Sequence, residues 1–268
     1  MPQTINTNLQ SLNAQRHLTT SRSSLGTSME RLSSGLRVNN SADDAAGLAI
    51  ASRMDSQVRG INVAIRNAND AISLAQTAEG ATATSVDILQ RMRELSVQAQ
   101  NATNGTTDRA NLDTEYQQLS GEITRIAAAT KFNGIAIVGA APGPQIFQVG
   151  PNNGDTLTVS TVAISTVTGD LLTSANASTA LSAIDSAIGV LTTNRATYGA
   201  AINRLGFAIS NLSISGENQS AAKGRIMDAD FAMETANLSR AQILQQAGNA
   251  MVAQANQLPQ QVMALLRN

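Results

Sequence analysis

The residues best suited to chemistry in this chain are two adjacent carboxylates, Asp43 and Asp44, and a single histidine, His17. Paired carboxylates can act as general acid and base or bind a metal ion, but only where a pocket gathers them with other groups. Here they follow Ser41 in an order typical of a helix N-terminus, a capping hydroxyl followed by acids in the first turn. We therefore interpret them as a helix start, with Ser41 as the N-cap.

Other residues of catalytic or metal-binding type are scarce. The chain has no Cys, which excludes disulfides, thiolate metal sites and Cys nucleophiles. His17 has no acidic cluster around it, whereas zinc sites use three or four ligands. The sequence contains no Gly-rich phosphate loop and no G-x-S-x-G nucleophile motif. We expect no enzymatic activity, no cofactor and no bound metal.

The composition favours helices that pack closely and associate with one another. Hydrophobic residues make up 42% of the chain, but aromatic residues only 2% and charged residues 14%, with a net charge of -1. No basic face is available for nucleic acid. No apolar stretch approaches the roughly 20 residues of a membrane span, and the first residues lack a basic segment followed by an apolar run. We expect no membrane insertion and no cleaved signal peptide.

Apolar residues repeat along the chain in a pattern that predicts long helices. Spacings of three and four mark a helix that packs lengthwise against another helix. Such a seam occurs at the N-terminal end in Leu25, Met29, Leu32 and Leu36, and at the C-terminal end in Leu244, Gly248, Met251, Ala255, Leu258, Val262 and Leu265. A longer one runs from Leu181 to Leu212. We expect the two ends to pair with each other and the inner seam to hold the subunit together.

Strand signals are confined to the middle of the chain. Residues 135–138, 145–149 and 156–164 read as strands separated by Gly and Pro turns, and residues 166–179 as a surface loop. The predicted fold is mainly α, an elongated rod of long coiled-coil-like helices from both halves of the chain, with a small β-hairpin region at about 132–179. We expect a terminal coiled-coil domain, residues 1–44 with 228–268, and a rod domain, residues 45–227.

A known family carries the same signature. The run LSSGLRVNNSADDAAGLAIA, residues 32–51, resembles the N-terminal signature of bacterial flagellin, and residues 5–8 and 225–262 are also similar to that family. The resemblance implies a structural subunit that self-assembles into the helical flagellar filament for motility. It implies that the terminal domain forms an inner tube, that the rod domain forms an outer tube, and that additional outer domains are missing. A hook–filament junction protein, which shares terminal heptad helices, is the alternative.

The resemblance also implies partners and a location. The partners are copies of the same chain, a flagellar export chaperone, and the filament cap and hook–filament junction proteins. The chain would be exported unfolded by the flagellar type III system and polymerised at the extracellular filament tip. The polymerisation seams would be the apolar repeats at the two ends, Leu25, Met29, Leu32, Leu36, Leu244, Met251, Leu258, Val262 and Leu265.

Innate immune receptors are a further class of implied partner. The segment from Leu89 to Leu95 resembles the flagellin segment that Toll-like receptor 5 binds in the free monomer. The implied contacts, which also form a face between subunits, are Gln90, Arg91, Glu94, Leu95 and Glu115. The simpler interpretation of the charged residues is a solvated helix face with ion pairs worth about 0.2–0.5 kcal/mol each.

Overall fold

The computed structural model describes residues 7–139, 143–164 and 166–266, and for residues 258–266 it describes the helix but not the side chains. The fold is mainly α with a small β region in the middle of the chain, as the sequence predicts. The chain divides into two compact units, residues 1–56 with 219–268 and residues 57–218. Two long helices, α2 (Ala45–Gln100) and α4 (Ser174–Met227), contribute residues to both units.

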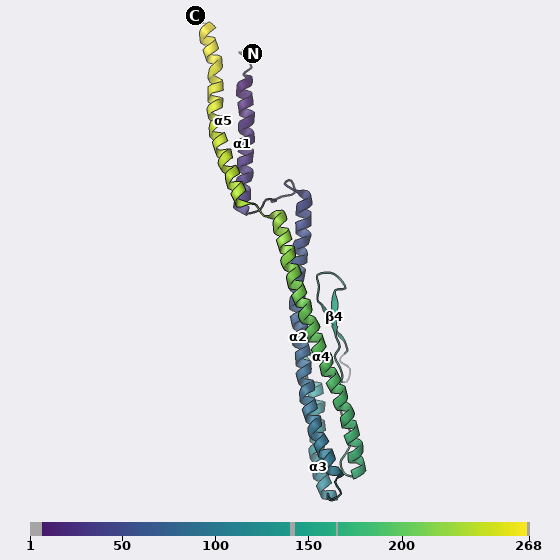
Figure 1. The fold of residues 1–268 in the computed structure, drawn as a ribbon. Helices are drawn as coiled ribbons and strands as arrows, with labels where there is room; N and C mark the ends of the chain where they lie inside the picture. The colour runs from purple at the N-terminus through teal and green to yellow at the C-terminus, as the bar shows by residue number, and fades with distance from the viewer. Residues whose placement is uncertain (1–6, 140–142, 165, 267–268) are drawn as a thin grey trace. The chain divides into compact units, whose positions relative to one another are not determined.

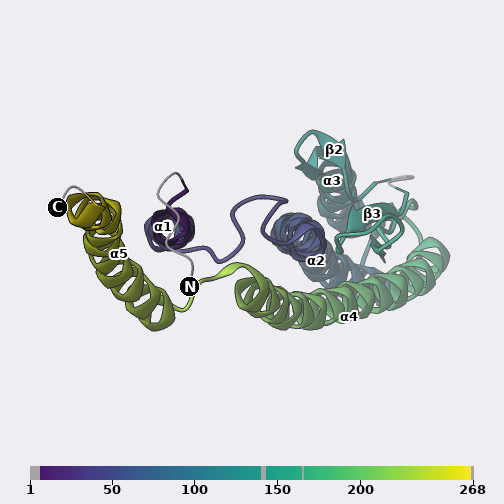
Figure 2. The same cartoon turned by 90° about the horizontal axis from the view of Figure 1, so that it is seen from above.

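The terminal unit is built on two helices from opposite ends of the chain. Helices α1 (Leu9–Ser34) and α5 (Phe231–Leu266) lie side by side (Figures 1 and 2). The Asn8 side chain accepts a hydrogen bond from the Ser11 N–H at 3.1 Å and so caps the first turn of α1. The helix ends at Gly35, which has a φ of 73° and therefore a left-handed conformation that favours glycine.

Short main-chain contacts join the segments that follow α1 and precede α5. Leu36 and Asp228 form an antiparallel β-bridge, and the Ala229 N–H donates to the Gly35 carbonyl at 2.9 Å. The next helix, α2, begins one residue after Asp44, whose Oδ1 accepts from the Gly47 N–H at 2.8 Å. Asp44 is therefore the N-cap, and the prediction that Ser41 fills this role is wrong because the chain between them forms a separate turn.

The unit of residues 57–218 has one main apolar core. Most of it is contributed by α2, by α3 (Thr106–Ala129) and by α4, and buried residues between 137 and 171 complete it. Between residues 64 and 78 the buried stripe of α2 consists of Leu74 and five alanines, namely Ala64, Ala68, Ala71, Ala75 and Ala78. On α4 the buried residues Ile184, Leu191, Tyr198, Leu205 and Leu212 belong to the seam predicted from the sequence. Ala64 and Leu212 pack with Ile61 in a separate small cluster, and the other residues named belong to the main core.

Two short antiparallel hairpins follow α3. Strands β1 (Lys131–Phe132) and β2 (Ile135–Ala136) enclose a two-residue turn in which Asn133 and Gly134 both have positive φ. Strand β3 (Gln145–Gln148) pairs with β4 (Thr156–Val159), with Gln145 opposite Val159. The predicted strands are therefore present but shorter than expected. The β3–β4 hairpin is fastened to α2, since the Asn67 side chain donates to the Gln148 carbonyl at 3.0 Å.

The segment predicted as a surface loop, residues 166–179, differs from that expectation. Helix α4 already begins at Ser174, and Val167 and Leu171 are buried in the core. The Ser120 hydroxyl donates to the Val167 carbonyl at 2.9 Å, which ties the segment to α3. The high content of Ser and Thr concealed these two anchors, because composition alone does not show which residues of a loop point inward.

The two tyrosines of the chain lie in this core but differ in their polar contacts. The Tyr198 hydroxyl accepts a hydrogen bond from the Val162 N–H at 3.1 Å. The Tyr116 hydroxyl is buried with no hydrogen-bond partner among the described residues. Burial raises the pKa of both tyrosines, and Asp113 and Asp170 raise that of Tyr116 further.

Candidate functional site

The two terminal helices, α1 and α5, contact each other along a seam. The residues that this pairing buries or half-buries repeat at alternating three and four on both helices. They are Ser11, Ala14, Leu18, Ser21, Leu25, Ser28 and Leu32 of α1, and Glu234, Leu238, Ala241, Gln245, Gly248, Val252 and Ala255 of α5. The helices run antiparallel, with Leu18 against Gly248 and Ser28 against Glu234. Small residues at Ala241, Gly248 and Ala255 permit this close contact.

The predicted C-terminal seam is therefore divided between two surfaces. Gly248 and Ala255 face α1, whereas Leu244 and Met251 remain 50% and 62% exposed. On α1, Leu25, Leu32 and the following Leu36 are half-buried, but Met29 is 57% exposed. The side chains of the remaining predicted seam residues, Leu258, Val262 and Leu265, lie outside the described part of α5. The pairing of the two ends thus leaves large apolar side chains exposed.

A polar cluster that the sequence analysis missed interrupts the seam. Glu234 is only 7% exposed, and its carboxylate accepts hydrogen bonds from the Ser28 hydroxyl at 2.9 Å and from Arg31 Nη1 at 3.0 Å. Desolvation alone would raise the pKa of Glu234, but the hydrogen bonds from Arg31, Ser28 and Asn237 lower it below the ordinary carboxyl value. The only signal in the sequence is that Ser28 and Glu234 occupy seam positions.

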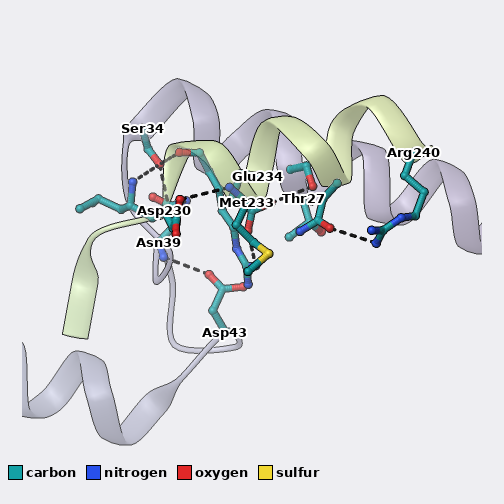
Figure 3. A network of polar contacts seen from close by, with 12 residues as sticks. Thr27, Ser34, Asn39, Asp43, Asp230, Met233, Glu234 and Arg240 are labelled. Carbon is teal, nitrogen blue, oxygen red and sulfur yellow. Dashed lines mark hydrogen bonds and ion pairs between the residues drawn. The ribbon is translucent and has the colours of Figure 1, made fainter. Parts of the chain in front are cut away.

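Polar contacts continue along the start of α5 and the connection after α1 (Figure 3). Asp230 Oδ1 accepts from the N–H groups of Ala232 and Met233, at 2.9 and 3.1 Å, and so caps α5. Asp43 Oδ2 accepts from the Asn39 N–H at 3.0 Å. Asp43, like Asp44, therefore holds backbone groups in place, in agreement with a structural interpretation of this acidic pair.

The predicted receptor and subunit face on α2 contains a compact ion-pair cluster. Arg91 Nε donates to Glu115 of α3 at 2.9 Å and Arg91 Nη1 donates to Glu94 at 2.8 Å. The hydrogen bond to Glu115, followed by that to Glu94, raises the pKa of the Arg91 guanidinium above its ordinary value. Gln90 is also exposed. The structure therefore brings Arg91, Glu94 and Glu115 together on one surface.

Leu95, the fifth residue predicted for this face, lies elsewhere. It is 1% exposed and packs in the core with Leu89 and Met92. Leu95 lies in the core below the exposed ion-pair cluster, so a partner cannot contact it while the unit is folded. The spacing of these three residues already follows the buried stripe of the helix.

The remaining candidates for chemistry are dispersed. His17 is exposed on α1. Within residues 7–139, 143–164 and 166–266, no three His, Asp or Glu side chains are grouped as metal ligands would be. None of the helices described is both long and apolar enough to cross a membrane.

Comparison with known proteins assigns both halves of the chain to the same family. Residues 5–140 match the bacterial flagellin N-terminal helical region, and residues 181–266 match the C-terminal helical region. A flagellin of Halalkalibacterium halodurans is 44% identical, with 98% of this chain and 99% of the relative covered. A flagellin of Bacillus subtilis is 41% identical with the same coverage. The crystal structure of Bacillus cereus flagellin has a TM-score of 0.51 at 37% identity, covering 59% of this chain and 94% of that one.

Proposed function

Because the chain belongs to the bacterial flagellin family, we propose that it is a structural subunit of the flagellar filament. It polymerises through apolar residues that the α1–α5 pair leaves exposed. The observation that carries the proposal is the exposure of Leu244 and Met251, seven residues apart on α5 beside a seam that is already occupied. Large apolar side chains aligned on an exposed helix are typical of an interaction surface.

A repeated contact of this kind gives an open polymer when it joins different surfaces of successive copies without closing a ring. We further propose that residues 1–44 with 228–268 line the inner tube of the filament and that residues 45–227 form the outer tube. The absence of Cys from the sequence is compatible with export of the chain in an unfolded form.

Substitution of the exposed pair tests the proposal. Leu244→Ser with Met251→Ser should abolish filaments under conditions in which the parent chain polymerises, as judged by electron microscopy and sedimentation. The matched control is Gln242→Ser with Asn249→Ser, which changes two exposed polar residues of the same helix at the same spacing. Circular dichroism verifies that the helices persist. Unchanged polymerisation of the Leu244/Met251 variant would overturn the proposed interface.

The finer expectations are proposals of the same kind. We propose export by the flagellar type III system, with an export chaperone, the filament cap and junction proteins as partners. The bulk filament role is favoured over a hook–filament junction role because the relatives that match nearly the whole chain are named as flagellins. Abundance distinguishes the two, since a filament subunit is the main component of isolated flagella.

We also propose that innate immune receptors recognise the free monomer through Gln90, Arg91, Glu94 and Glu115. Arg91 is the central residue because it contacts both carboxylates. Arg91→Ala should weaken activation of Toll-like receptor 5 by purified monomer. Arg125→Ala, which removes another exposed ion pair on α3, is the matched control. Equal activation by both variants would contradict this assignment.

A further inference from the structure

Glu234 stands apart among the charged residues of this chain. Of the side chains that the structure describes, it is the only charged one that is buried, and Ser28, which donates to it, is buried as well. A charge that is taken out of water needs its partners, because an unpaired buried charge is strongly unfavourable. Two of its partners, Ser28 and Arg31, come from the opposite helix.

The rest of the seam discriminates weakly between alternative alignments of the helices. Ala241, Gly248 and Ala255 are small residues that recur every seven positions, so a shift of α5 by one heptad replaces one small residue with another. The main-chain contacts at the Leu36–Asp228 bridge join residues 35–38 to residues 227–229 in the observed alignment, but they involve no side chain of the seam.

Glu234 tolerates no such shift. Displacement by one heptad in one direction brings it opposite Ser21 and Ser24, which carry no charge. Displacement in the other direction carries it past the end of α1 at Ser34. Of these three alignments, only the observed one gives the carboxylate both a cation and a hydroxyl donor.

A second polar contact at the far end of the pair agrees with the same alignment. The Ser11 hydroxyl donates to Asn256 Oδ1 at 2.8 Å, and the Asn8 side-chain amide donates to the Ala255 carbonyl at 2.8 Å. The two polar contacts therefore lie on either side of the small-residue contact between Leu18 and Gly248.

We propose that Glu234, held by Arg31 and Ser28, is the positioning residue that fixes the register of α1 against α5. A single polar residue in an otherwise apolar helix seam can specify register at some cost in stability. Register in turn decides which residues of the paired helices remain exposed, and so which surface the unit presents. The register lies within one chain, so cross-links within one chain can test it, and polymerisation is scored separately.

Introduced cysteines can report the register because the chain has none of its own. A Cβ atom at Gly248 would lie 3.7 Å from the Leu18 Cβ, within the range of about 3.5–4.5 Å that a disulfide requires. Leu18→Cys with Gly248→Cys therefore reports the observed register. Leu18→Cys with Ala241→Cys, or with Ala255→Cys, reports a slip of one heptad, since residues seven apart are separated by about 10 Å along a helix.

The experiment compares the three reporter pairs in the full-length chain under a glutathione redox buffer, in conditions in which the parent chain polymerises, and scores only cross-links within one chain. In the otherwise unchanged chain we expect cross-linking only between positions 18 and 248. With Arg31→Leu and Glu234→Leu added, we expect the two slipped cross-links to rise about tenfold or more, the response to a change of about 1.4 kcal/mol between registers. Replacing both partners avoids an orphaned buried charge.

Two results would overturn the proposal. If the double-leucine variant cross-links only at positions 18 and 248, the bridge or the apolar seam sets the register without Glu234. If all three reporters lose cross-linking while circular dichroism is unchanged, the cluster is needed for pairing itself and not for alignment. Glu234→Gln, which keeps an acceptor for Ser28 but loses the charge, should give slipped cross-links at a level between those of the parent and the double-leucine variant. No increase over the parent would contradict the role of the charge.

Discussion

The two buried tyrosines allow one chemical change to be tested with opposite expected signs. Tyr198→Phe removes the acceptor of the Val162 N–H, which is only partly buried, so the free energy of unfolding should fall by about 1–2 kcal/mol. Tyr116→Phe removes a hydroxyl that is buried with no partner among the described residues. Burial of an unpaired hydroxyl costs about 1–3 kcal/mol, so we expect this variant to match or exceed the parent in stability, by up to about 1 kcal/mol.

The measurement is urea unfolding of the full chain followed by tyrosine fluorescence. The chain has two Tyr and no Trp, and both tyrosines lie in the unit of residues 57–218, so the signal reports that unit alone. Each variant retains one tyrosine as the probe and serves as the control for the other. Equal destabilisation by the two substitutions would refute the reasoning, because it would mean that the Tyr116 hydroxyl is satisfied after all.

The remaining predictions concern pH and packing. Burial raises the pKa of Tyr116 and Tyr198. Their contribution to stability is therefore present below the unfolded pKa of about 10 and is lost as the pH rises through the folded pKa values. Tyrosinate absorbance should appear at higher pH than in the unfolded chain, together with loss of helix. Glu234 has a lowered pKa, so its contribution to stability is present above the unfolded pKa of about 4.3 and is lost as the pH falls through the folded pKa. Glu234→Gln should therefore reduce the loss of helix that acid causes in a circular dichroism titration. Leu205→Ala should reduce the free energy of unfolding by about 2–5 kcal/mol, whereas Phe207→Ala, at a side chain that is 77% exposed, should change it by less than about 0.5 kcal/mol in urea titrations.

The long helices could be predicted from the sequence because periodicity is a property of each helix by itself. Leu191, Leu205 and Leu212 are buried as their spacing requires. The same rule applied to Leu95 would have placed it in the core with Leu89 and Met92, and its assignment to an exposed face rested on resemblance instead.

Features that depend on distant partners could not be predicted in this way. Glu234 reads as an ordinary acid in the first turn of a helix, and its burial depends on Ser28 and Arg31, about two hundred residues earlier in the chain. The N-cap of α2 is difficult to predict for a local reason. Ser41 and Asp44 are both good capping residues, and the choice between them depends on the turn that Asp43 stabilises with Asn39.

The alanine stripe of α2 has a consequence for how the core is assembled. Alanine has no side-chain rotamers to restrict, so burying Ala64, Ala68, Ala71, Ala75 and Ala78 incurs almost no side-chain conformational entropy and offers no alternative rotamers in which to misfit. Each alanine also contributes little apolar area. Cohesion in this part of the helix is therefore spread over many small contacts, and neighbouring helices can approach it closely at little cost in side-chain entropy.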